Sequence, residues 1–161
     1  MNNLEFLSWG FVVWIHVVAA ITWVGGMVFV ALVLAPGLRR LPPDQRSEVI
    51  GSVGVAARGL GWISLLVLLV TGGLNLIHLH PSWDSLAGQL LLAKISVVGG
   101  LVGLTILHDF ILGPKLSGIR RAVGVQHPTF RRLQVCVQWL ARFNLFLALC
   151  VVFLAVLLAR S

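Results

Sequence analysis

The chain has 161 residues, of which 58% are hydrophobic and 11% are charged, and its mean hydropathy is +0.99. A water-soluble domain of this size is much less apolar, so the composition excludes that class. A formal net charge of +7 would suit a nucleic-acid-binding protein. The basic residues, however, lie between long apolar segments, which is the distribution of a membrane protein, and we expect a lipid bilayer and no nucleic acid as partner.

Four apolar segments are long enough to cross the hydrocarbon core of a bilayer, which takes about 20 helical residues. They cover approximately 9–35, 58–77, 88–112 and 135–159. No strand alternation is visible, and backbone groups in lipid must be satisfied within the segment, so all four segments are predicted to be helices. The sequence predicts an all-α fold, a polytopic membrane four-helix bundle that forms a single transmembrane domain over residues 1–161.

The first predicted helix carries one ionisable residue, His16, in the stretch "WIHVVAAITWVGG". Ionisable side chains inside a membrane usually face the bundle interior and serve a function. A neutral imidazole nitrogen is a ready axial donor to haem iron. The alternative is a buried imidazole that only hydrogen-bonds a neighbouring helix. Trp23 and Gly26 continue the same face and leave room either for close helix packing or for a flat ligand.

The second predicted helix has a polar stripe at i, i+4 and i+7, formed by Thr71, Asn75 and His78. His80 and Asp84 follow in the connection to the third helix. His78 and His80 flank a single residue, and such a pair either binds copper or another divalent metal or is a solvated helix end. The chain has only two methionines, so the thioether ligands typical of copper paths are scarce.

The third predicted helix carries Lys94 in one half and His108 and Asp109 in the other. Lys94 either extends to the membrane interface or lies buried as a neutral amine that can bind iron. His108 and Asp109 are expected either to pair with Arg142 of the fourth helix or to bind or support a ligand. Lys94 and His108 are 14 residues apart, or about 21 Å along the axis, so one ligand does not reach both.

The polar residues of the fourth predicted helix gather in the same half as His108. Gln134, Gln138 and Arg142 form a stripe at i, i+4 and i+8, and Asn144 lies near it. Arg142 is therefore a candidate charge partner for any group bound between the helices.

The two halves of the chain resemble each other at an offset of 78 residues. "VLAPGLRRL" and "ILGPKLSGIRR" align Pro36 with Pro114, and the same offset carries His16 onto Lys94. Two parallel repeated hairpins imply a pseudo-twofold axis along the membrane normal. We therefore expect His16 and Lys94 at similar depth on opposite sides of this axis.

Most basic residues lie in or beside the two connections that join the first helix to the second and the third to the fourth. These residues are Arg39, Arg40, Arg46, Arg58, Lys115, Arg120, Arg121, Arg131 and Arg132. The positive-inside rule makes these loops cytoplasmic and leaves both termini outside, as in a multi-pass protein of the inner membrane. The basic loops could also hold anionic lipid headgroups, although topology alone explains them.

Three helices resemble a known family. "WIHVVAAITWVGGMVFVALVLAPGL" resembles the first helix of the CopD copper-resistance membrane proteins and the HemJ-type protoporphyrinogen oxidases. "LLLAKISVVGGLVGLTILHDF" and "ARFNLFLALCVVF" are similar to the third and last helices of the HemJ-type proteins. The resemblance implies a helical bundle that binds b-type haem, with His16 and Lys94 at ligand positions and with Arg142 and Asn144 at the matching inner positions.

The sequence is therefore interpreted as that of a membrane protein that binds b-type haem and acts in electron transfer or in a related redox step. His16 is the expected axial ligand, and Lys94 or His78 the second; His108 and Asn144 are further candidates. The alternatives are a copper transport or resistance protein that uses His78 and His80 with His16 deeper in, a structural or assembly subunit of a membrane redox complex, and a HemJ-type oxidase. The expected protein partners are other membrane redox subunits or further copies of this chain. Leu145 and Phe146 replace the Glu and Pro usual in the oxidases, which weakens the last alternative.

Overall fold

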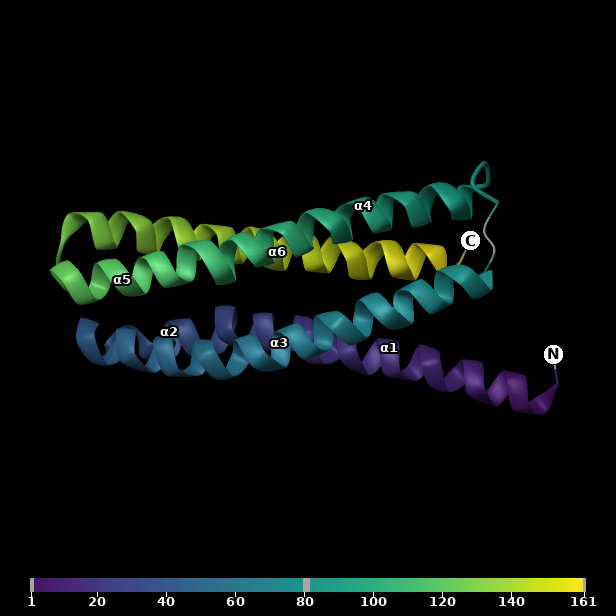
Figure 1. Cartoon of the computed structure of the whole chain (residues 1–161), viewed down its shortest axis with the longest axis horizontal. Helices are drawn as coiled ribbons and strands as arrows, with labels where there is room; N and C mark the ends of the chain where they lie inside the picture. Colours follow the sequence, from purple (N-terminus) through teal and green to yellow (C-terminus); the bar gives the residue numbers. More distant parts are fainter. Residues whose placement is uncertain (1, 80–81, 161) are drawn as a thin grey trace.

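The structure is a computed structural model that describes residues 2–79 and 82–160. Four long helical rods run side by side (Figure 1), and they are apolar and long enough to span a membrane. In chain order the elements are α1 (Asn3–Phe29), η1 (Val30–Leu34), α2 (Ala35–Gly37), η2 (Leu38–Arg40), α3 (Pro43–Leu79), α4 (Leu86–Ile106), η3 (Leu107–Leu112), α5 (Gly113–Val123) and α6 (Pro128–Leu158). The predicted all-α membrane bundle is confirmed.

The helices are longer than the apolar segments from which they were predicted. α3 begins at Pro43, α6 begins at Pro128, and the third rod continues to Val123 through α5. Proline is well suited to the first helical turn, and it starts both α3 and α6. The expected basic loops are therefore mostly helical, with short turns at residues 41–42 and 124–127. Hydropathy locates the part of a helix that lies in lipid and not its polar continuation, which explains the difference.

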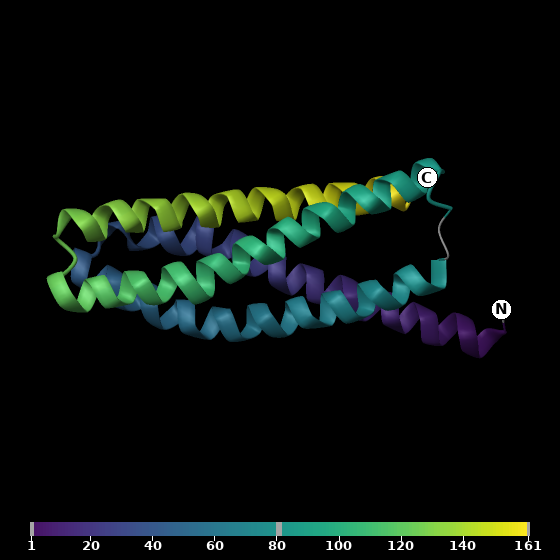
Figure 2. The ribbon, with the colours of Figure 1, turned by 45° about the horizontal axis from the view of Figure 1, so that its top comes forward.

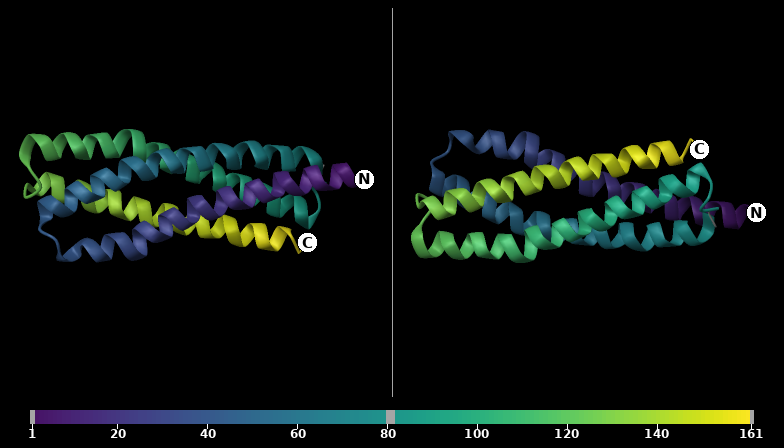
Figure 3. Two further views of the ribbon diagram at one scale, coloured as in Figure 1. Left: turned by 90° about the horizontal axis from the view of Figure 1, so that it is seen from below. Right: turned by 90° about the horizontal axis from the view of Figure 1, so that it is seen from above.

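The rods pair into two hairpins. α1 packs along α3, and α4 packs along α6. Both chain termini lie at the end of the bundle where α3 ends and α4 begins, and the turns of each hairpin lie at the opposite end (Figure 1). The hairpins meet where α1 contacts α6, as two further views show (Figure 2, Figure 3). This arrangement is the one that the internal repeat predicts.

Each hairpin has a π-helical segment at the same place in its first rod. The segment η1 ends just before Pro36, and η3 ends just before Pro114. In η1 the amide of Ala35 donates to the carbonyl of Val30, and in η3 the amide of Gly113 donates to the carbonyl of His108. Proline lacks an amide hydrogen and crowds the preceding turn, and a widened turn accommodates it. The two segments share the offset of 78 residues, so the duplication extends to backbone geometry.

The interior of the bundle is thin and partly polar. Leu101 and Ala148 are 1% exposed, and Thr71 and Asn144 are buried polar residues. Many large apolar side chains face outward instead, as lipid-facing residues do. Helices in a membrane have no hydrophobic drive to associate, so close packing and hydrogen bonds between helices specify the arrangement. The buried polar residues therefore mark the specific contacts.

Gly88 in the first turn of α4 allows the preceding residues to fold back closely on this helix. A β carbon at this position would overlap the carbonyl oxygen of Ser82 and lie 2.7 Å from the Cα of Trp83. Both neighbours are backbone atoms, so the Gly88→Ala variant is expected to lose about 1–3 kcal/mol of stability. The measurement is the midpoint of thermal unfolding in detergent.

The matched control is Gly99→Ala in the same helix, where a β carbon would meet nothing within 4 Å. It should unfold at or slightly above the wild-type temperature, because alanine favours helix more than glycine does. Equal unfolding temperatures for both variants would contradict the close approach at Gly88.

Candidate functional site

His16 on α1 is held by Thr71 on α3. Its Nδ1 lies 2.7 Å from the Thr71 Oγ1, and the Thr71 hydroxyl donates to the Val67 carbonyl at 2.6 Å. A threonine hydroxyl has one hydrogen, and placing it in the 2.6 Å contact with the Val67 carbonyl leaves Oγ1 as the acceptor for Nδ1. This network assigns the imidazole proton to Nδ1. The Nε2 atom of His16 then carries the lone pair and is the nitrogen able to bind a metal.

The surroundings of His16 fix the orientation of its ring. Thr71 is 7% exposed, whereas His16 itself is half-buried. A β carbon on Gly72 would lie 3.4 Å from the Cε1 atom of His16, so the imidazole lies directly against this glycine. Thr71 and Gly72 together give the ring a hydrogen bond on one edge and a close contact beside it. This is the arrangement of a histidine whose second nitrogen is presented in one direction.

Lys94 approaches the same region from the other hairpin. It is half-buried on α4, and it lies close enough for its charge to act on the His16 imidazole. The two residues that the repeat relates are therefore within electrostatic range of each other. Ala148 stands 77 residues after Thr71, the offset that also relates Trp62 to Trp139, and it is buried. Lys94 therefore has no equivalent of the threonine that holds His16.

His78 lies further along α3 than Thr71, in the last turn of that helix. It lies seven residues beyond Thr71 on α3, which is about 10 Å along the helix axis. Its ring stacks on Trp9 with the centroids 3.8 Å apart. His80, the other half of the predicted copper pair, lies outside the described residues. Within residues 2–79 and 82–160, no group of three His, Cys, Asp or Glu side chains is placed to hold a metal ion.

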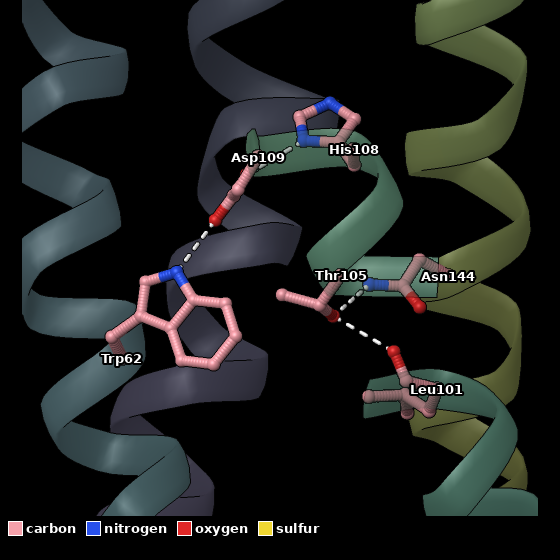
Figure 4. A network of polar contacts seen from close by, with 6 residues as sticks. All are labelled: Trp62, Leu101, Thr105, His108, Asp109 and Asn144. Atoms are coloured by element: carbon pink, nitrogen blue, oxygen red, sulfur yellow. Dashed lines mark hydrogen bonds and ion pairs between the residues drawn. The ribbon is translucent and has the colours of Figure 1, made fainter. Parts of the chain in front are cut away.

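A second polar cluster surrounds Asp109 at the π-helical segment η3 (Figure 4). The Trp62 Nε1 donates to Asp109 Oδ2 at 2.9 Å, and the His108 Nδ1 lies 2.8 Å from Asp109 Oδ1. Arg58 adds its charge to this carboxylate, and its Nη2 would lie 3.5 Å from a β carbon on Gly113. The cluster connects α3 of the first hairpin to η3 of the second.

The predicted partner of this cluster, Arg142, lies elsewhere. Its guanidinium is exposed and stands over the ring of Trp139, 5.0 Å from the centroid. The expected pairing with His108 and Asp109 is therefore wrong. A spacing of four residues drifts round a helix, and at i+8 the rotation from the first residue reaches roughly 80°. Gln134 and Arg142 consequently do not share a face.

Asn144 links α6 to α4 within the second hairpin. Its Nδ2 donates to the Thr105 Oγ1 at 2.9 Å, and the Thr105 hydroxyl donates to the Leu101 carbonyl at 2.8 Å (Figure 4). Asn144 is 8% exposed, and its Oδ1 is buried without a hydrogen-bond partner in the described structure. The contact is one between helices and lies apart from His16.

Three partners in these clusters were not predicted from the sequence: Arg58, Trp62 and Thr105. A signal for Trp62 was present, because an indole N–H inside a membrane segment needs an acceptor. Asp109 was the natural candidate for this acceptor, because it is the one Asp or Glu residue within the four predicted spans. Nothing comparable marked Arg58, which the apolar pattern placed at the edge of a loop.

Two comparisons with known proteins give a match to this chain. The family model described as copper resistance protein D matches residues 58–158. An uncharacterized protein of Aquifex aeolicus (strain VF5) is 33% identical over 143 residues, which cover 88% of this chain and 89% of the relative. No solved structure matches. The family match includes α4 with Lys94 and the Asp109 cluster, and it begins after His16.

Proposed function

The chain belongs to the copper resistance protein D family, and within that family we propose that it is a membrane redox protein that binds b-type haem. His16 would hold the iron from the first hairpin and Lys94 from the second. The observation that carries this proposal is the hydrogen bond between His16 and Thr71, because it leaves Nε2 as a metal donor. When bound, haem supplies one-electron transfer.

The set of donors favours haem over a bare metal ion. A porphyrin brings four nitrogen ligands, so the protein needs to supply only one or two axial donors. A copper or zinc ion held by side chains needs a cluster of donors. The described residues offer no group of three such side chains, whereas they do offer one imidazole and one amine from opposite hairpins. This donor set fits an axial role.

The decisive experiment is a spectrum of the purified protein. We expect protein made with ample haem supply and purified in detergent to show a reduced-minus-oxidised difference spectrum of b-type haem and a positive pyridine haemochrome assay. Well-folded protein without haem would end the proposal. Co-purification of partner subunits with no cofactor would instead support the role of an assembly subunit.

The Thr71→Val variant tests how His16 is held. Valine keeps the shape of threonine but cannot accept the hydrogen bond from Nδ1, so the imidazole loses its fixed tautomer and orientation. Loss of such a supporting partner typically lowers metal affinity about 10–100-fold, and we expect a similar fall in haem affinity. Haem titration into the apoprotein measures it.

Thr22→Val is the matched control for Thr71→Val. The Thr22 hydroxyl donates to the Val18 carbonyl of its own helix at 2.9 Å, and this bond has no role at His16. Its haem affinity should equal that of the wild type. If Thr71→Val also binds haem as the wild type does, the hydrogen bond does not support the ligand.

Copper transport is the second candidate, because the description of the matching family names copper resistance. Such a protein would use His78, in the last turn of α3, together with His80. It predicts copper bound by the purified protein, measured by mass spectrometry of the metal content, and loss of that copper in a double alanine variant of His78 and His80. Copper retained by this variant would exclude the pair as its site.

A further inference from the structure

A cavity of about 350 Å³ lies between the two hairpins at the basic end of the bundle. Three arginines line it: Arg39 from η2, Arg46 from α3 and Arg131 from α6. Ser47 and Gln134 add neutral polar groups, and the lining includes no acidic residue. Positive charge from both hairpins thus converges on one open-sided cavity. An excess of basic residues at one membrane face does not by itself require such convergence.

The arginines at this cavity have hydrogen-bond donors to spare. The Nε of Arg46 is buried and has no partner among the described residues. Arg131 donates to the Gln126 side chain through one nitrogen, and a guanidinium has five N–H donors. Among the described residues, no carboxylate lies within 4.0 Å of these guanidinium groups. A buried N–H without an acceptor is costly, and an anion would satisfy it.

Ser47 is fixed as a further donor. Its Oγ accepts a hydrogen bond of 3.0 Å from the Nη1 of Arg120, which also donates to the Ser47 carbonyl at 3.0 Å. The hydroxyl therefore keeps its own hydrogen for another acceptor. A smaller adjoining cavity of about 100 Å³ shares Ser47 and Gln134 with the first. Arg120 lines this smaller cavity and so extends the positive surface.

We propose that this cavity binds a phosphate group, carried either by the headgroup of an anionic phospholipid or by a soluble phosphate. Arginine suits a phosphate because its planar fork can donate two hydrogen bonds to two phosphate oxygens. All of the charged residues at the cavity are arginines. A phosphate here bridges Arg46 of the first hairpin and Arg131 of the second, so its binding stabilises the assembled bundle.

The test is thermal unfolding of the full chain in a nonionic detergent at constant ionic strength. Tryptophan fluorescence monitors the unfolding. Inorganic phosphate and phosphatidylglycerol are titrated separately. Phosphatidylcholine is the reference, because its own choline neutralises its phosphate. We expect a saturable rise of the unfolding temperature with at least one phosphate source. A rise with phosphatidylglycerol alone identifies a lipid site, and a rise with inorganic phosphate identifies a site for soluble phosphate.

Three arginine variants locate the site. In Arg46→Gln and Arg131→Gln the apparent affinity should fall roughly tenfold or more, as expected for the loss of a charge-assisted contact. Arg132→Gln removes the same charge at the next position, outside the cavity, and should bind as the wild type does. Arg131 is exposed, so its variant keeps the fold and gives the answer even if Arg46→Gln does not fold.

Two results would overturn the phosphate site. One is the absence of a saturable rise with either phosphate source in the wild type. The other is an equal loss of affinity in Arg131→Gln and Arg132→Gln, which would show attraction to the surface charge in general. Haem content is unaffected in either case, so the test is independent of the haem proposal.

Discussion

A His16→Ala variant is expected to assemble in the membrane and to contain almost no haem. Alanine removes the nitrogen that Thr71 orients, and it leaves Lys94, a flexible amine without an equivalent threonine, as the remaining donor. Loss of a residue that only supports a ligand lowers metal affinity by about 10–100-fold. Loss of the ligand itself should cost at least as much, so the haem content should fall by roughly a hundredfold or more. Stability should change little, because His16 is half-buried and alanine favours helix. The pyridine haemochrome assay, per mole of folded protein, measures the content.

Two controls separate the loss of a ligand from damage to the fold. His108→Ala alters the histidine of the second polar cluster and should keep its haem. Adding imidazole to His16→Ala should restore part of the spectrum, because the small molecule can occupy the space of the missing ring. Full haem content in His16→Ala, together with its loss in His108→Ala, would move the site to the Asp109 cluster.

An Asp109→Ala variant is expected to lose more stability than the loss of either one of the hydrogen bonds that this carboxylate makes would cost. The carboxylate accepts hydrogen bonds from Trp62 and pairs with His108, and it faces the charge of Arg58. Its removal leaves the Trp62 N–H without its acceptor and takes away the opposite charge that acts on Arg58. Loss of a hydrogen bond to a charged group typically costs about 1.5–3 kcal/mol. Unfolding in mixed micelles of increasing denaturing-detergent content, followed by tryptophan fluorescence, measures the loss.

Trp62→Phe and a double variant show which part of the cluster matters. Trp62→Phe removes one neutral donor and should cost only about 0.5–1.5 kcal/mol. Adding Arg58→Met to Asp109→Ala should restore part of the lost stability, because replacing both charges is often neutral. An Asp109→Ala variant as stable as the wild type would mean that the carboxylate does not balance Arg58.

The membrane fold and the neighbourhood of His16 and Lys94 could be predicted because each depends on a property of the chain itself. Apolar length determines the spans, and the offset that aligns Pro36 with Pro114 also aligns His16 with Lys94. Residues at equivalent places in two parallel hairpins lie at equal depth, and for this reason the repeat predicts that Lys94 lies near His16. The ligand role of both residues stays a prediction.

The second cluster could not be predicted, because it depends on how helices rotate against one another. Arg142 matched a spacing in the sequence, yet the drift of that spacing carries it to the exposed side, over Trp139. Asp109 meets Trp62 and Arg58 across the hairpin boundary, and hydropathy contains no information about which faces meet. The first part of α3, from Pro43 to the predicted start at residue 58, was not predicted either. It has no apolar run, and hydropathy detects only the apolar part of a helix.

The paired π-helical segments have a consequence for the helices that follow them. A π-helical turn holds more residues than an α-helical turn, so the helix beyond it is rotated relative to the helix before it. Because such a turn stands before Pro36 in one hairpin and before Pro114 in the other, both hairpins are rotated in the same sense. The faces that are equivalent on one side of the irregularity therefore remain equivalent on the other.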